Sequence, residues 1–105
     1  MAAADPFTAL GDAHRRRILT LLGDQDLSVA EIASALPISR PAVSRHLRLL
    51  KDAGLVAEAP QGTRRIYRLQ AEGVEAVRAY LAQVWGESAA RFQLRAENTS
   101  EERRP

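Results

Sequence analysis

The stretch SRPAVSRHLRLLKDAGLV, residues 39–56, decides the fold of this 105-residue chain, because it has the pattern of one complete helix with two different faces. Val43, Leu47 and Leu50 recur at the spacing that places side chains on one side of a helix, so we expect that side to be buried. The opposite side carries the basic and hydroxyl side chains of Arg40, Ser44, Arg45 and Arg48. The pattern therefore predicts a surface helix that keeps a basic face exposed.

Sequence signals mark both ends of this helix and the start of the helix before it. Ser39 has the position of an N-cap, Pro41 falls in the first turn, where its missing N–H is not needed, and Gly54 ends the helix. Upstream, Ser28 and Glu31 stand three residues apart in the pattern of a capping box. The helix that they begin ends about three residues before Ser39, and two helices joined so closely are typical of a helix-turn-helix.

Two further helices are predicted ahead of this pair. The segment that follows Asp5-Pro6 predicts a short first helix. The segment DAHRRRILTLLGD, residues 12–24, predicts a second helix with an apolar stripe and with Gly23 as its stop.

A β-hairpin is predicted after the helix-turn-helix, over residues 55–69. LVAEA and RRIYRLQ have the pattern of strands, and PQGT between them supplies turn residues. Tyr67 and Leu69 are expected to face inward, with Ile66 as the alternative. The exposed side and the tip of the hairpin then carry Arg64, Arg65 and Arg68.

A long helix is predicted from about Ala71 to about Ala96. Its apolar stripe consists of Val74, Val77, Leu81, Val84, Trp85 and Phe92. The stripe is longer than a domain of this size can cover from within, and an exposed apolar face of that length indicates a partner. We therefore expect a mainly α domain over 1–97 with a small β-hairpin wing, followed by a disordered tail over 98–105.

Composition and charge narrow the function. A hydrophobic fraction of 46% fits a globular domain, and the absence of cysteine excludes disulfides and thiolate metal sites. No signal-peptide or membrane-spanning pattern is found, so we expect a cytoplasmic protein. Residues 40–68 hold seven basic and two acidic residues, a balance of +5 within a net charge of +2. This asymmetry suggests a surface for a polyanionic partner, and charge alone leaves a solvated basic face equally open.

The basic helix and the basic hairpin together predict a surface for double-stranded DNA. A helix in the major groove shows a basic face to the bases and buries its other face in its own domain. Arg40 would reach guanine edges, while Ser39 and the helix N-terminus would approach a phosphate. The full predicted DNA-binding set is Ser39, Arg40, Pro41, Ser44, Arg45, Arg48, Gly62, Thr63, Arg64 and Arg65.

Three segments carry a family resemblance: ALGDAHRRRILTLL, LSVAEIASALPISRPAVSRHLRLLKDAGLV and GTRRIYRL. The chain resembles the ArsR family of bacterial winged-helix repressors from about Phe7 to Trp85. The resemblance implies a homodimer whose first and last helices pair, and repression of transcription from an inverted repeat in promoter DNA. The dimer interface that it implies contains Phe7, Leu10, Leu81, Val84, Trp85 and Phe92.

Metal sensing, which many members of that family perform, is not expected from these residues. The helix LSVAEIA lacks the cysteines of one known site, and the last helix lacks the histidines of another. The only histidines are His14 and His46, and zinc sites need three or four suitable ligands. We expect no metal and no cofactor, and His46 is interpreted as a packing or phosphate-contacting residue.

Other functions are weighed against this one. An enzyme is not indicated, because an imagined Asp12–His14 acid–base pair has no nucleophile and no phosphate loop beside it. The arginines of residues 15–17 fit a solvated face or a phosphate contact. A winged helix can also serve as a protein-docking module without a DNA site. A repressor of this kind could be released by a small apolar ligand bound near Trp85 and Phe92, or by an unrecognised metal.

Overall fold

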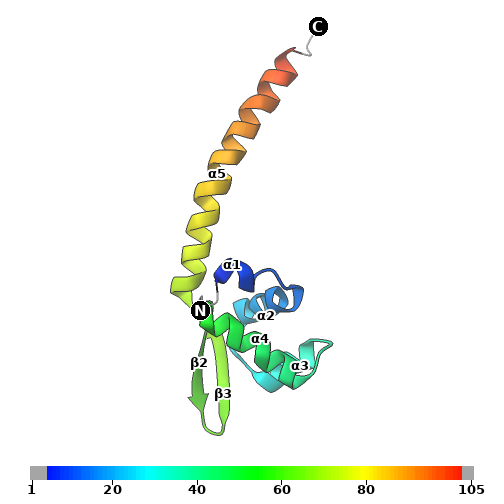
Figure 1. The fold of residues 1–105 in the computed structure, drawn as a ribbon, viewed down its shortest axis with the longest axis vertical. Coiled ribbons are helices and arrows are strands. Elements are labelled where there is room, and N and C mark those ends of the chain that lie inside the picture. Colours follow the sequence, from blue (N-terminus) through cyan, green and yellow to red (C-terminus); the bar gives the residue numbers. More distant parts are fainter. Residues whose placement is uncertain (1–4, 103–105) are drawn as a thin grey trace. The chain divides into compact units, whose positions relative to one another are not determined.

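The computed structural model describes the backbone of residues 5–102, together with their side chains except those of 87–90, 92 and 97–102. The chain divides into two compact units, residues 1–75 and 76–105. The elements, in chain order, are α1 (Pro6–Ala9), α2 (Ala13–Asp24), β1 (Leu27–Ser28), α3 (Val29–Ala35), α4 (Arg40–Asp52), β2 (Val56–Gln61), β3 (Arg64–Leu69) and α5 (Ala71–Glu102) (Figure 1).

Aspartate caps begin the first two helices. Asp5 accepts a hydrogen bond from the Phe7 N–H at 3.1 Å, which opens the predicted short helix α1. Asp12 accepts two backbone N–H bonds in the same way and opens α2. The second helix continues through the expected stop at Gly23 and ends one residue later, at Asp24.

Local capping also fixes the predicted helix-turn-helix, α3 and α4. The Ser28 Oγ accepts from the Glu31 N–H at 3.2 Å, and the Glu31 carboxylate accepts from the Ser28 N–H at 2.9 Å, so the capping box is confirmed. Ser39 is the N-cap of α4, with Pro41 in its first turn. Gly54 follows the helix with a φ of +79°, the left-handed conformation that lets the chain turn away.

The core of the first unit lies where α2, α3 and α4 meet the start of the hairpin. Val43, Leu47 and Leu50 are fully buried, as their spacing predicts. They pack in the same core as the other large side chains with almost no exposed surface, Ile18, Ile32 and Leu55. Burial of one face of α4 in this core holds its opposite face at the surface.

The hairpin belongs to a three-stranded antiparallel sheet with the order β1-β3-β2. The sequence predicts only two strands; β1 is the additional one, and it pairs Leu27 with Tyr67. The turn is shorter than predicted, because Pro60 lies inside β2 and only Gly62 and Thr63 separate the strands. Pro60 is tolerated there because β2 is an edge strand. Neither predicted face of β3 is deeply buried: Tyr67, Leu69 and the alternative Ile66 are all half-buried.

The first turn of α5 packs directly against the connection between α4 and β2. A Cβ atom added at Gly73 would lie 1.8 Å from the backbone oxygen of Gly54, so no other residue fits there without movement. The backbone N–H of Gln70 also donates to the Leu55 oxygen at 2.9 Å. These contacts fix the first turn of α5, which itself belongs to the first unit.

The last helix extends further than the sequence predicts. Instead of ending near Ala96 before a tail over 98–105, α5 continues through Glu102; residues 103–105 lie outside the described part. The reason is that no glycine or proline, the residues that break helices, occurs between Gly86 and Pro105. Within the described residues, no helix has the length and apolar character needed to cross a membrane.

Candidate nucleic-acid interface

The exposed face of α4 carries the predicted DNA-contacting side chains. Arg40, Ser44, Arg45 and Arg48 are all exposed, on the side of the helix away from Val43, Leu47 and Leu50. Among the described residues, these three arginines form no ion pair. In this part of the chain, no carboxylate forms a salt bridge with their charges.

The N-terminal end of α4 and the tip of the hairpin meet around one depression of about 320 Å³. It is lined by Ser28, Val29, Ala30, Arg40, Thr63, Arg64 and Arg65. The fold thus brings Arg40 of the helix beside the arginines at the start of β3, which lie 24 and 25 residues away in the sequence. Gly62, with a φ of +64°, makes the tight turn that places Thr63 and these arginines at the tip.

Arg64 is tied to the helix-turn-helix by two interactions. Its Nη2 donates to the Glu31 carboxylate at 2.7 Å and to the Ser28 Oγ at 3.0 Å. The pKa of Glu31 is lowered, first by the backbone N–H of Ser28 and also by the charge of Arg64. Arg64, predicted as a DNA contact, thus already forms an ion pair and a hydrogen bond within the protein.

Glu58 holds the hairpin against α4. This half-buried carboxylate on β2 pairs with Lys51 at 2.7 Å and with Arg65 at 3.1 Å. Its pKa is lowered chiefly by the hydrogen bond from Lys51 and then by that from Tyr67, its cross-strand neighbour. Burial and the same carboxylate raise the pKa of Tyr67 to about 12. Sequence reasoning did not identify Glu58 as the carboxylate that joins the hairpin to α4. The signal that could have found it was an acidic residue among seven basic ones.

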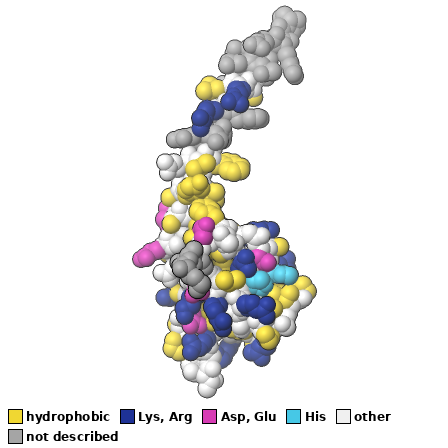
Figure 2. All heavy atoms as spheres, in the orientation of Figure 1, with side chains coloured by type: hydrophobic (Ala, Val, Ile, Leu, Met, Phe, Trp, Pro, Cys, Tyr) yellow, Lys and Arg dark blue, Asp and Glu magenta, His cyan; other side chains and the backbone are white. Residues whose placement is uncertain are grey.

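Basic side chains gather over the first unit on the face seen in Figure 2, with a few acidic side chains between them. A second depression of about 320 Å³ lies between α4 and the hairpin and includes Ser44, Arg48 and Arg65. Together with the first depression, it gives a basic surface formed jointly by helix and wing. Such a surface suits a phosphate backbone, which dominates affinity in protein–DNA complexes.

The residues predicted for a dimer interface are mostly exposed in the single chain. Phe7 on α1 is 42% exposed, while Leu10 beside it is half-buried. On α5, Leu81 and Val84 are each 43% exposed and Trp85 is 71% exposed. The side chain of Phe92, also predicted for this interface, lies outside the described residues.

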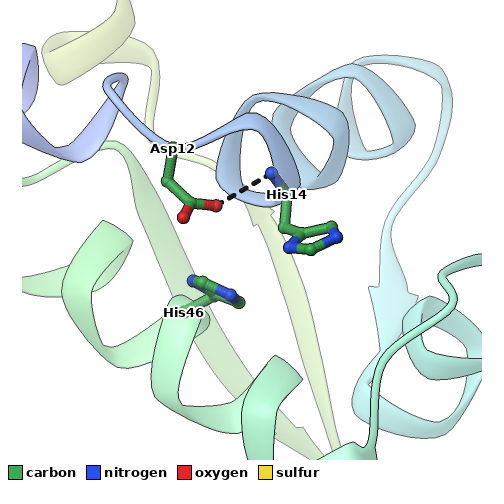
Figure 3. A group of neighbouring side chains, drawn as sticks. All are labelled: Asp12, His14 and His46. Carbon is green, nitrogen blue, oxygen red and sulfur yellow. Dashed lines mark hydrogen bonds between the residues drawn. The ribbon is translucent and has the colours of Figure 1, made fainter.

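Three potential ligand groups meet between the start of α2 and α4, and one of them is distant in the sequence from the other two. Asp12, His14 and His46 each offer an atom, and these atoms all lie within 4.8 Å of one another. Figure 3 shows the Asp12 carboxylate directed from the start of α2 toward the His46 ring on α4. Sequence reasoning paired Asp12 with His14 but did not bring His46 to them, because 32 positions separate the two histidines.

Arg15 connects this cluster to the α1–α2 connection. Its Nε donates to the Ala9 oxygen at 2.7 Å, and its Nη1 lies 3.3 Å from the Nδ1 of His46. The neighbouring Arg16 donates to the Leu10 oxygen at 2.7 Å. These two arginines therefore donate to backbone oxygens around α1. Arg16 and Arg17 are exposed, as expected of a solvated face, and a phosphate contact stays a prediction.

Comparison with known proteins places these features in a family. Residues 12–58 match the family described as bacterial regulatory protein, arsR family. The chain is 49% identical over 77 residues to the HTH-type transcriptional regulator Rv2034 of Mycobacterium tuberculosis, a match covering 73% of this chain and 72% of that protein. It is 39% identical over 56 residues to the transcriptional repressor SdpR of Bacillus subtilis, covering 53% of this chain and 62% of that protein, which is less than two thirds of its length.

Solved structures agree with the sequence matches. A crystal structure described as a possible transcriptional regulator for arsenical resistance superposes with a TM-score of 0.72 at 37% identity. The superposition covers 77% of this chain and 84% of the other.

Proposed function

The chain belongs to the arsR family of bacterial regulatory proteins, DNA-binding transcriptional regulators rather than enzymes, and from this premise we propose that it is a homodimeric repressor of an inverted-repeat operator. In the proposed complex, α4 lies in the major groove and the β2–β3 wing contacts the adjacent backbone or minor groove. The contacts come from residues 39–48 of the helix and 62–65 of the wing.

The observation that carries this proposal is the joint surface of α4 and the wing. Arg40, Arg45 and Arg48 are exposed and without ion pairs among the described residues, and the wing tip shares a depression with Arg40. A protein-docking module is disfavoured, because protein interfaces are depleted of charge at their centre. The unneutralised arginines instead match the charge of DNA.

The dimer is supported by the exposed apolar side chains of the last helix. Leu81, Val84 and Trp85 expose more than two fifths of their surface in the single chain. A two-fold dimer is the commonest way to cover such a surface, and it gives each operator two equal half-sites. Repression is supported by the relative SdpR, which is named a transcriptional repressor.

Selection from a random duplex library tests the proposal and identifies the operator sequence in the same experiment. The full chain is incubated with the library, and bound sequences are enriched and read. We expect an inverted repeat with half-sites about one helical turn apart, or a multiple of it. The affinity should fall steeply with salt as counterions are released.

A matched pair of variants distinguishes specific binding at the proposed interface from non-specific binding by charge. Arg48→Ala removes a charge from the proposed interface, whereas Arg17→Ala removes one from an exposed position of α2. We expect the first variant, and not the second, to lose affinity for the selected sequence. Enrichment of no sequence, or equal losses in both variants, would favour the docking module.

A further inference from the structure

We propose that Asp12, His14 and His46 form a site for a divalent transition metal of the Zn²⁺ class, between the start of α2 and α4. The cluster contains both histidines of the chain and one carboxylate, with all three ligand atoms within 4.8 Å of one another. No thiol takes part, so imidazole nitrogen and carboxylate oxygen are the only ligand types in this cluster.

The donor set suits such an ion. Zn²⁺ accepts imidazole nitrogen and carboxylate oxygen, and two histidines with one carboxylate leave a coordination position open for water. Asp12 uses its Oδ1 to accept the N–H bonds of His14 and Arg15, at 2.8 and 3.1 Å, which leaves its second oxygen for a metal. Those bonds, that of Arg15 first, lower the pKa of Asp12, and burial lowers the pKa of His46.

The present spacing is wider than that of a loaded site. Bonds of 2.0–2.1 Å in a tetrahedron place ligand atoms about 3.3 Å apart. The atoms must therefore approach one another by up to about 1.5 Å, which side-chain rotation can supply without a change of fold. All three residues are half-buried, so the ion would be partly shielded from water but still able to enter.

Arg15 competes with a metal for His46. A guanidinium can only donate, so the Nδ1 of His46 at 3.3 Å must accept, which leaves the proton on Nε2. A metal bound to Nδ1 would replace the Arg15 guanidinium there. A metal bound to Nε2 would need the tautomer of His46 that carries its proton on Nδ1. The positive charge of Arg15 also opposes the ion. Removal of that side chain should therefore strengthen metal binding.

Zn²⁺ binding to the untagged full chain, measured by competition with a chromophoric chelator, tests the site. We expect one Zn²⁺ per chain. His14→Ala and His46→Ala should each weaken binding by at least about tenfold, because each removes a direct ligand. Asp12→Asn should also weaken it while keeping the helix cap, since asparagine caps as well as aspartate. Arg15→Gln should bind more tightly than the wild type.

Asp26→Asn is the control, because it removes an exposed carboxylate outside the cluster, and it should match the wild type. A second readout is thermal unfolding. Saturating Zn²⁺ should raise the wild-type Tm by on the order of 10 °C, because the ion binds the folded cluster. Circular dichroism shows whether each variant folds. If His46→Ala does not fold, the folded His14→Ala variant still decides the test. Absence of saturable binding, or equal binding in the folded histidine variant, overturns the proposal.

Discussion

Two arginines of the proposed interface differ in what they contact before DNA binds. Arg45 on α4 is exposed and, in the described part of the chain, has no ion pair, whereas Arg64 on β3 is held by Glu31 and Ser28. A phosphate that recruits Arg64 must share or break an ion pair with a carboxylate. Arg64 therefore orders the wing as well as offering charge, and Arg45 is the freer of the two to read bases.

This difference predicts distinct effects on DNA binding. Arg45→Ala should remove a base contact, at a cost of about 1–3 kcal/mol, and should change which operator variants bind best. Arg64→Ala should weaken binding to all sequences and flatten the salt slope by about one unit per half-site. The measurement is the affinity of both variants for a panel of single-base operator changes over a salt series. If only Arg64→Ala changes the rank order, the two roles are reversed.

The half-buried Glu58 predicts a loss of stability in acid. Lys51 and then Tyr67 depress its folded-state pKa below the usual 4.5, so its contribution is present above that value and is lost as the pH falls through the folded pKa. The free energy of unfolding should therefore drop below about pH 4.5. Glu58→Gln should reduce that drop in urea titrations across pH 3–7, and Asp26→Asn, which leaves Glu58 in place, should keep it. Equal acid sensitivity in wild type and Glu58→Gln would rule this out.

At the scale of elements, sequence signals succeeded where the decisive contacts are local. The Ser28–Glu31 box and the Ser39 cap depend on residues within one turn, and both helix starts were predicted correctly. The strand β1 escaped prediction because two residues carry no periodicity and their pairing depends on Tyr67, forty positions later. The contacts of Arg64 and the meeting of His14 with His46 were missed for the same reason: only the folded chain brings them together.

Close packing at the start of α5 predicts an asymmetry between two glycines. Gly73→Ala should destabilise the protein by on the order of 1–3 kcal/mol, because its Cβ would collide with the Gly54 carbonyl. Gly23→Ala, with open space around it near the end of α2, should be neutral or stabilising by about 0.5–1 kcal/mol. Urea unfolding of the two variants beside the wild type measures both effects. A Gly73→Ala protein as stable as the wild type would show that this contact yields easily.

At the scale of the whole molecule, the proposed dimer predicts a mass and its sensitivity to one side chain. Sedimentation should give about 23 kDa, twice the 11.5 kDa of the chain. Trp85→Ala should weaken association by about 2 kcal/mol or more if the indole lies at the centre of the interface. Gln83→Ala, two residues away and on the other side of the helix, should not. A monomer at micromolar concentration would contradict the dimer.

The sheet has a consequence for how copies of this chain can meet. One of its edges is β1, only two residues long and followed at once by α3; the other is β2, which carries Pro60. Neither edge offers a long row of free backbone donors and acceptors to a strand from another copy. Short edges and an edge proline are features that disfavour strand-to-strand aggregation between copies of a protein.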